Sequence, residues 1–145
     1  MKKFLLIVIA LCSWQMFTFA DNDKPVQLSQ MPEKAQTFIK SHFDQKEISF
    51  SKMENEWFEK NYTVFFTNGE SIEFDKNGEW IEIHSKVNGV QASVIPAPIR
   101  KYLEKNYPNE KVLKIDRDKN NTEVELSNHM DIKFDKNYQI IDIDN

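Results

Sequence analysis

Apolar residues recur at helical spacing in two short segments of the chain, and each segment is opened by proline. Proline is tolerated in the first turn of a helix because its missing N–H would have no partner there. The first stripe follows Pro32 and consists of Ala35, Phe38, Ile39, His42 and Phe43. The second follows Pro96 and Pro98, ends at Pro108, and consists of Ile99, Tyr102, Leu103 and Tyr107. This spacing predicts two amphipathic helices.

The segments after each helix alternate between apolar and polar residues with a period of two, which is typical of half-buried strands. The alternation predicts strands near 47–54, 57–67, 70–75, 79–85, 111–117, 121–127, 130–135 and 138–143. Asn68-Gly69 between apolar runs indicates a hairpin, and Asp75 to Gly78 indicates another tight turn. Connections this short make neighbouring strands antiparallel.

One face of these strands is expected to point toward the helices. Its members in the first half are Ile48, Phe50, Tyr62, Val64, Phe66, Ile72, Phe74, Ile81 and Ile83. Its members in the second half are Val112, Val124, Leu126, Ile132, Phe134, Ile141 and Ile143. Because each helix has a single apolar stripe, both helices must cover this face. The predicted fold is α+β, with one antiparallel sheet and both helices on one side.

The two halves also match each other in sequence. Met31-Pro32 aligns with Ile95-Pro96 at an offset of 64, and the strand region after residue 62 aligns at an offset of 60. At that second offset Phe74-Asp75-Lys76-Asn77 aligns with Phe134-Asp135-Lys136-Asn137. We expect a tandem repeat of a helix plus about four strands. The alternative is two unrelated segments that share a common turn sequence.

The chain begins with a basic n-region, an apolar run from Phe4 to Phe17, and small residues at the end of Thr18-Phe19-Ala20. This pattern predicts a signal peptide over 1–20, cleaved before Asp21, and a periplasmic or secreted product. The alternatives are a retained membrane anchor and a lipoprotein acylated at Cys12, the only cysteine. The predicted organisation is then a flexible tail over 21–27, unit one over 28–86, a linker over 87–93 and unit two over 94–145, the units forming one compact domain.

Removing the leader changes the charge balance and the available chemistry. The 145-residue chain has 19 Lys and Arg against 23 Asp and Glu, and without Lys2 and Lys3 the net charge becomes −6. An acidic chain disfavours nucleic-acid and anionic-membrane partners, and three glycines leave no phosphate-binding glycine loop. If Cys12 is removed, thiol catalysis, disulfides and thiolate metal sites are excluded.

With that fold in place, particular residues resemble a known family. Residues 31–43 (MPEKAQTFIKSHF) followed by 68–83 (NGESIEFDKNGEWIEI) resemble the PepSY-like, beta-lactamase-inhibitor-like periplasmic proteins of Bacteroidetes. The resemblance covers roughly residues 28–145, and unit two is a degenerate copy in which Gly69 corresponds to His129 and Gly78 to Tyr138. It implies an exported tandem repeat whose wider relatives include protease-propeptide inhibitory modules and beta-lactamase inhibitors. The family offers no catalytic residues to carry over.

The residues themselves favour no catalytic or metal constellation. His42, His84 and His129 lack partners at a metal-ligand spacing, and no Ser-His-acid relay is evident around Ser71 or Ser85. Residues 75–79 resemble a calcium loop superficially, but Lys86 stands where that loop needs its bidentate glutamate. The neighbouring carboxylates lack the cleft that a glycosidase requires. We therefore expect no enzyme activity, no metal and no cofactor.

The most informative feature is a set of residues that alternate with the apolar face and therefore point to the other side of the sheet. This alternation places Ser51, Thr63 and Ile140 on the uncovered side of the sheet, and predicts that Trp57, Phe65 and Trp80 are partly solvent-accessible there. Aromatic residues on an uncovered sheet face mark contact surfaces, although they also stiffen a sheet by cross-strand pairing. The candidate partner-binding residues are Trp57, Phe65, Trp80, Glu82 and His84.

Three functions follow as hypotheses. The first is an exported, non-catalytic module that binds, and in the inhibitory case blocks, an exported protein or peptide through this open aromatic face. The second is a periplasmic small-ligand or peptide-binding protein that uses a groove between helices and sheet. The third is an enzyme, for which the sequence offers no constellation.

Overall fold

The computed structural model describes residues 23–56 and 58–145, so the predicted signal peptide over 1–20 and Trp57 lie outside the described residues. Its helices are α1 (Glu33–His42) and α2 (Ala97–Asn106), with 3₁₀ turns at Leu28–Gln30, Gln45–Glu47 and Ala92–Val94. The strands are β1 (Lys24–Pro25), β2 (Ile48–Glu56), β3 (Glu59–Phe66), β4 (Ser71–Phe74), β5 (Trp80–His84), β6 (Val112–Arg117), β7 (Asn121–Leu126), β8 (Asp131–Asp135) and β9 (Ile140–Asp144).

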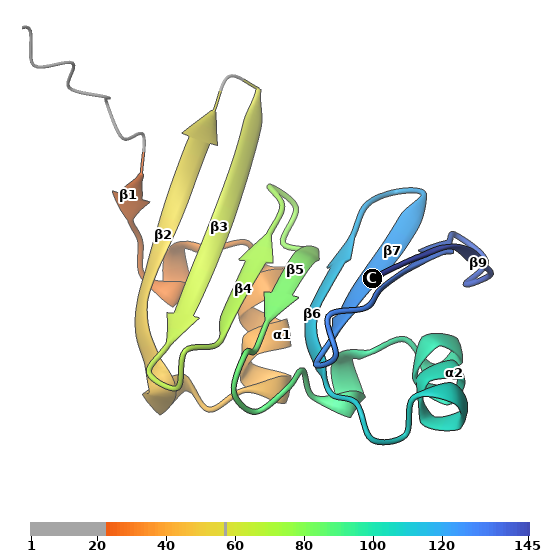
Figure 1. Cartoon of the computed structure of the whole chain (residues 1–145). Helices are drawn as coiled ribbons and strands as arrows, with labels where there is room; N and C mark the ends of the chain where they lie inside the picture. The colour runs from red at the N-terminus through yellow and green to blue at the C-terminus, as the bar shows by residue number, and fades with distance from the viewer. Residues whose placement is uncertain (1–22, 57) are drawn as a thin grey trace, which may run out of the picture.

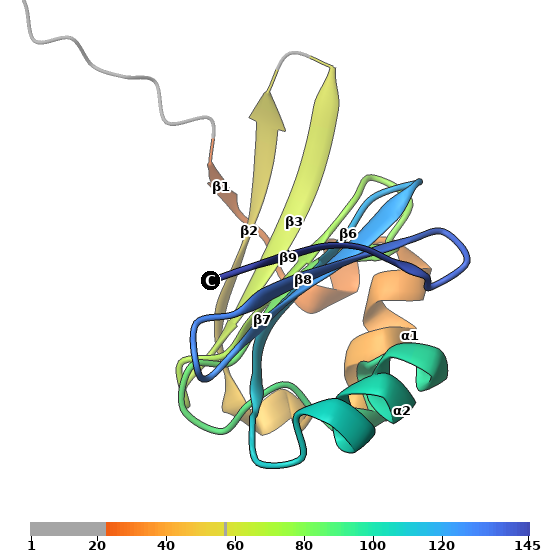
Figure 2. The same ribbon diagram turned by 45° about the vertical axis from the view of Figure 1, so that its right-hand side comes forward.

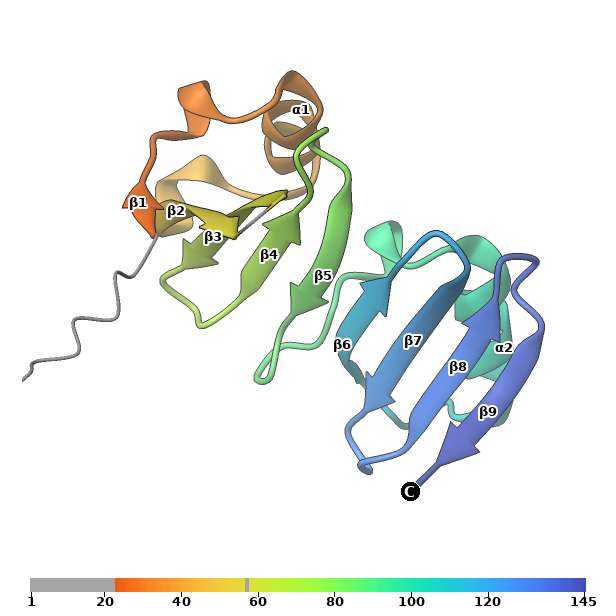
Figure 3. The same ribbon diagram turned by 90° about the horizontal axis from the view of Figure 1, so that it is seen from above.

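The strands form one nine-stranded antiparallel sheet in sequence order, β1 to β9 (Figures 1 and 3). Both helices lie on the same side of this sheet, which curves around them (Figure 2). The predicted α+β fold is confirmed. None of the helices within 23–56 and 58–145 is long and apolar enough to cross a membrane.

The core lies between the sheet and the two helices. Ala35 and Ile39 of α1 and Ile99 and Leu103 of α2 are buried. Cross-strand pairing aligns one inner row from β2 to β9, which consists of Ser51, Val64, Ile72, Ile83, Ile115, Val124, Ile132 and Ile143. Most of this row is fully buried. Hydrophobic burial along it joins the two halves of the sheet into one core.

Two phenylalanines anchor the helices to the sheet in the same way in each half. Phe74 and Phe134 are buried, as expected. Phe38 of α1 meets the ring of Phe74 edge-on with centroids 5.8 Å apart, and Tyr102 of α2 meets Phe134 edge-on at the same distance. Edge-to-face pairs of this kind add to the stabilisation from burial alone.

Irregularities in the sheet overturn part of the predicted face assignment in the first half. A register shift at Ser49 places Phe50 opposite Phe65 on the uncovered side, and it turns Ser51 inward, where 7% of it is exposed. A second shift pairs Phe74 with Trp80 and leaves Ile81 as the extra residue. Because one inserted residue reverses the alternation on one side of it, the predictions for Phe50, Ser51, Ile81 and Trp80 were wrong.

The second half shows the same effect at its outer edge. The shift in β9 pairs Ile140 with Phe134, so Ile140 belongs to the helix face, and Ile141 becomes the extra residue. Ile143 lies on the predicted face, but every residue of β9 is exposed because this is the edge strand of the sheet. The prediction that Ile141 and Ile143 point into the core was therefore wrong for Ile141 and incomplete for Ile143, which is 44% exposed.

The two halves share an order and several backbone features. Each half contains one α-helix followed by four antiparallel strands, and strand β1 precedes the helix of the first half. Leu113, the extra residue of β6, follows Ser49 by 64 positions, and Ile141 follows Ile81 by 60. Positive φ angles recur at the same spacing, at Gly69 and His129 and at Gly78 and Tyr138. These correspondences support the duplication, which stays a prediction.

Residues 24–25 differ from the loose tail expected over 21–27. They form strand β1 and pair with Lys52 and Met53 of β2. The backbone N–H of Val26 donates to the carbonyl of Ser51, and the Ser51 hydroxyl donates to the carbonyl of Val26. Residues 24–26 are therefore attached to β2.

Candidate functional site: the open face of the sheet

The open face is the side of the sheet away from α1 and α2. Of the predicted partner-binding residues, Phe65, Glu82 and His84 lie on this face and are half-buried. Ser71 of β4 pairs with both Phe65 and His84, so these two side chains belong to one row across three strands. Trp57 lies outside the described residues.

Trp80 is the exception, because it lies on the helix side and is only 6% exposed. Its ring is 6.5 Å from that of Phe38 on α1, while the Arg117 guanidinium lies 3.7 Å from its centroid on β6. The Arg117 Nε–H also donates to the Trp80 carbonyl at 2.8 Å. The predicted solvent exposure of Trp80 was therefore wrong, and the residue contributes to the junction between the two halves.

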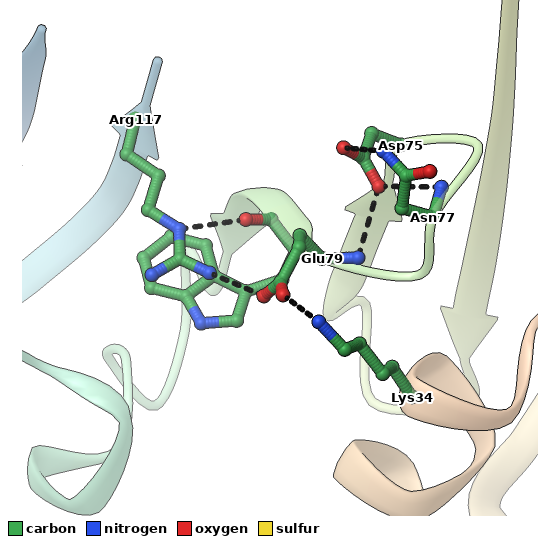
Figure 4. A network of polar contacts seen from close by, with 6 residues as sticks. Lys34, Asp75, Asn77, Glu79 and Arg117 are labelled. Carbon is green, nitrogen blue, oxygen red and sulfur yellow. Dashed lines mark hydrogen bonds and ion pairs between the residues drawn. The ribbon is translucent and has the colours of Figure 1, made fainter. Parts of the chain in front are cut away.

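Glu79 connects this junction to the first helix (Figure 4). Its carboxylate accepts from Lys34 Nζ of α1 at 2.6 Å and lies 3.6 Å from Arg117 Nη2. Partial burial lowers the pKa of Arg117, and the charge of Glu79 opposes that shift. The three groups link α1, the β4–β5 turn and β6.

The open face carries an aromatic pair at its β2–β3 end. Phe50 and Phe65 stack with ring centroids 4.4 Å apart and an interplanar angle of 15°. Phe50 is 54% exposed, and Lys52 Nζ lies 5.9 Å from the Phe65 centroid. An exposed, ordered aromatic pair provides an apolar contact area at low entropic cost.

The rest of the open face is dominated by carboxylates. One row places Glu73, Glu82, Asp116 and Glu123 directly opposite one another on β4, β5, β6 and β7. The next row places Glu125, Asp131 and Asp144 opposite one another on β7, β8 and β9. Like charges directly opposite across strands destabilise a sheet. The face therefore concentrates negative charge at a cost to the isolated fold.

Lysines offset only part of this charge. Lys114 lies 3.1 Å from Glu82 and 3.4 Å from Asp116, and Lys133 lies 3.8 Å from Glu123. Lys52 pairs with Asp23 and Glu54. The acidic side chains on the face are Glu54, Glu56, Glu59, Glu73, Glu82, Asp116, Glu123, Glu125, Asp131, Asp135, Asp142 and Asp144. The three lysines named above neutralise only part of this charge, so the face is strongly acidic.

Titration of the face reflects this crowding. Burial raises the pKa of Glu73 above its ordinary value, and the charges of Glu82 and Glu54 raise it further, while a hydrogen bond from Asn61 opposes the shift. Burial lowers the pKa of the Lys114 ammonium, but the hydrogen bonds and charges of Glu82 and Asp116 raise it by more, so the pKa lies above its ordinary value. A neighbouring cation would favour the ionised form of these carboxylates.

Two polar side chains considered as candidate reactive groups, Asp75 and Ser85, have hydrogen-bond partners within the protein. No group of three or more His, Cys, Asp or Glu within 23–56 and 58–145 is placed to hold a metal. Asp75 uses its carboxylate to accept from the backbone N–H groups of Asn77 and Glu79. Ser85, considered as a nucleophile, instead donates to the buried Glu70 at 2.9 Å.

Sequence reasoning missed Phe50 and Arg117. Phe50 was assigned to the core because the irregularity at Ser49 leaves no mark in the alternation. Arg117 points to the same face of β6 as the buried Ile115. A charged residue at such a position usually has a partner within the protein, and this could have been predicted from the sequence.

Comparisons with known proteins agree with this architecture. A family model described as "Putative beta-lactamase-inhibitor-like, PepSY-like" matches residues 60–142. A structure described as a "putative calcium-regulated periplasmic protein" from Bacteroides thetaiotaomicron is 52% identical, with a TM-score of 0.84 over 87% of this chain and 99% of that one. A "putative periplasmic protein" from Bacteroides vulgatus is also 52% identical, with a TM-score of 0.82 and the same coverage.

A second Bacteroides vulgatus protein, described as a "putative periplasmic protein of unknown function", is 30% identical, with a TM-score of 0.78 over 85% of this chain and 99% of that one. The comparison with curated proteins finds no match. None of these descriptions indicates a catalytic activity.

Proposed function

Because this chain belongs to the PepSY-like, beta-lactamase-inhibitor-like family and its structural neighbours are described as periplasmic, we propose that it is an exported, non-catalytic protein-binding module. The signal peptide would be removed between Ala20 and Asp21. The open face of the sheet would receive the partner, as in an inhibitory module that covers part of another protein.

The row Glu73–Glu82–Asp116–Glu123 is the observation that carries this proposal. Four carboxylates on adjacent strands repel one another, and the two nearest lysines neutralise part of their charge. Basic side chains of a partner would relieve this repulsion and would steer association. The partner is therefore a protein with a basic surface.

The Phe50–Phe65 stack adds the apolar part of the proposed interface. Interfaces combine an apolar centre with charged surroundings, and aromatic residues are enriched at their centres. The stack on β2 and β3 and the acidic row on β4 to β7 lie on the same face, and they meet where β3 pairs with β4. A basic surface that presents an exposed apolar side chain next to its Lys and Arg residues would match both features.

Site-specific photocrosslinking in cells tests the proposal. A photoreactive amino acid at Ser71, between Phe65 and His84, should form an adduct with one protein partner, whereas the same group at the exposed Thr37 of α1 should not. The adduct should disappear when Glu82 and Glu123 are both changed to Lys. An adduct that forms equally from Thr37, or that survives both charge reversals, would contradict docking on the open face.

One relative is described as calcium-regulated, and that description belongs to the relative. On this chain the proposal is based on the charge and aromatic pattern, because Asp75 in the loop that superficially matches a calcium site is engaged by backbone N–H groups. The alternative function, small-ligand or peptide binding, is favoured by a different feature, a cavity at one end of the sheet.

A further inference from the structure

Several turns meet at one end of the sheet and enclose an open cavity of about 870 Å³. The β4–β5, β6–β7 and β8–β9 turns line it, together with the first residues of β3. Its size is within the range of pockets that hold small organic ligands. Phe58, Ile81 and Tyr138 supply its accessible apolar surface, while the buried Trp80 lies behind Arg117.

Four carboxylates line this cavity, and three of them, Glu79, Asp75 and Asp118, are engaged by the protein itself, while Glu59 makes no ion pair within 4.0 Å among the described residues. Glu79 is held by Lys34 and Arg117. Asp75 accepts from the N–H groups of Asn77 and Glu79. Asp118 accepts from the N–H groups of Asn120 and Asn121, which lower its pKa.

The lysines around the cavity have no such partners among the residues that the structure describes. Lys60, Lys76, Lys119 and Lys136 line it. In the described part of the chain none of the four makes an ion pair within 4.0 Å. Lys60 lies against the Tyr62 ring at 5.3 Å, which leaves its charge unneutralised. Together with Arg117, five cationic side chains line the cavity against four carboxylates, so its lining carries a small excess of positive charge on an otherwise acidic protein.

Arg117 fixes one donor group in the cavity wall. Its stacking on Trp80 and its bond to the Trp80 carbonyl hold the guanidinium plane in place. Nε and Nη2 face protein partners, while Nη1 makes no hydrogen bond to the described residues. A preorganised guanidinium of this kind suits the oxygens of carboxylate or phosphate.

We propose that this cavity is a binding site for a small organic anion that carries carboxylate groups on an apolar body. The carboxylates would meet Lys119, Lys136 and Arg117, and the apolar body would lie against Ile81 and Tyr138. This proposal deepens the small-ligand alternative and does not depend on docking at the open face, since the cavity and the acidic row share none of their residues.

Titration with benzene-1,3,5-tricarboxylate tests the site. Backbone amide shifts in the protein of residues 21–145 should move at the β4–β5, β6–β7 and β8–β9 turns, with a dissociation constant that rises with salt. The Lys119→Gln, Lys136→Gln double variant should weaken binding about tenfold or more, as expected when close charge partners are removed. The matched Lys101→Gln, Lys105→Gln variant on the exposed side of α2 should bind as the unmodified protein does.

Two further ligands define the class. The neutral benzene-1,3,5-tricarboxamide should not bind, and inorganic phosphate should bind much more weakly because it lacks the apolar body. Absence of binding by the tricarboxylate, equal binding of the amide or phosphate, or equal losses in both double variants would overturn the proposal. Because the open-face variant Glu82→Lys, Glu123→Lys should keep its affinity for the tricarboxylate, failure here is separable from failure of protein docking.

Discussion

Replacing Gly78 by alanine tests how closely the β4–β5 turn is pressed against helix α1. Gly78 has a φ of +82°, and a Cβ at this position would lie 2.8 Å from the Ala35 backbone nitrogen and 2.9 Å from the Pro32 Cβ. Gly69 is a matched control, because it has a φ of +85° but nothing lies within 4 Å of the position that a Cβ would take there. Comparing the two glycines separates backbone strain from packing.

The backbone cost is the same at both sites. A left-handed conformation costs an L-residue about 1–2 kcal/mol, and replacing glycine recovers about 0.4–1 kcal/mol by restricting the unfolded chain. Gly69→Ala should therefore lower the free energy of unfolding by about 1 kcal/mol. Gly78→Ala adds an overpacking cost of about 1–3 kcal/mol, because the atoms it meets include helix backbone that cannot rotate away.

Urea unfolding followed by far-UV circular dichroism measures both values, with the free energies compared at unchanged m-value. We expect Gly78→Ala to be less stable than Gly69→Ala by more than the error of the measurement. Equal losses for the two variants would mean that the turn does not press on α1, and the packing of the first half would need revision.

Three further outcomes are expected from single substitutions. Trp80→Ala should lower the free energy of unfolding by about 3–5 kcal/mol in the same assay, because the residue belongs to the core rather than to an exposed surface. Ser85→Ala should cost about 1–3 kcal/mol by leaving the buried Glu70 without its donor, whereas Ser127→Ala, at an exposed position, should cost less in the same titration. Glu73 has a raised pKa when folded, so stability should fall as pH rises from its unfolded value of 4.5 through that raised value. Glu73→Gln should remove this part of the pH dependence, as measured by melting temperature between acid and neutral pH.

The positions of helices and strands could be predicted because their signals are local. Pro32 and Pro96 mark the helix starts, and the alternation after each helix places every long strand within a few residues of its observed bounds. Strand β1 could not be predicted, because two residues that include Pro25 carry no periodic signal. Its pairing depends on the edge that β2 provides.

The face assignments were less predictable because they depend on register. From the sequence alone, either Trp80 or Ile81 could point toward the helices. Only the pairing of Phe74 with Trp80 shows that Trp80 does so. The same uncertainty moved Phe50 out of the predicted core. One inserted residue therefore changed which aromatic residues form the candidate site, while Phe65, Glu82 and His84 kept their predicted face.

The exposure of β9 could not be predicted from the alternation of residues along the strand. Ile143 pairs with the buried Ile132 and has the expected parity. It is exposed because an edge strand has a neighbour on one side only. The alternation of residues along a strand predicts which face of the sheet a side chain points to. It does not predict whether a helix or a neighbouring strand covers that side chain.

The binding of the crosslinked partner to charge-reversed forms of this protein tests the central claim most directly. The dissociation constant should be measured by calorimetry at low and moderate salt for the unmodified protein, for Glu82→Lys with Glu123→Lys, and for Glu47→Lys with Glu104→Lys. The last pair makes the same charge change at exposed sites before β2 and on α2. We expect the open-face pair to weaken binding about tenfold or more and to flatten the salt dependence, while the control pair has little effect. Equal weakening by both pairs would show that net charge alone drives association, and the open face would not be the binding surface.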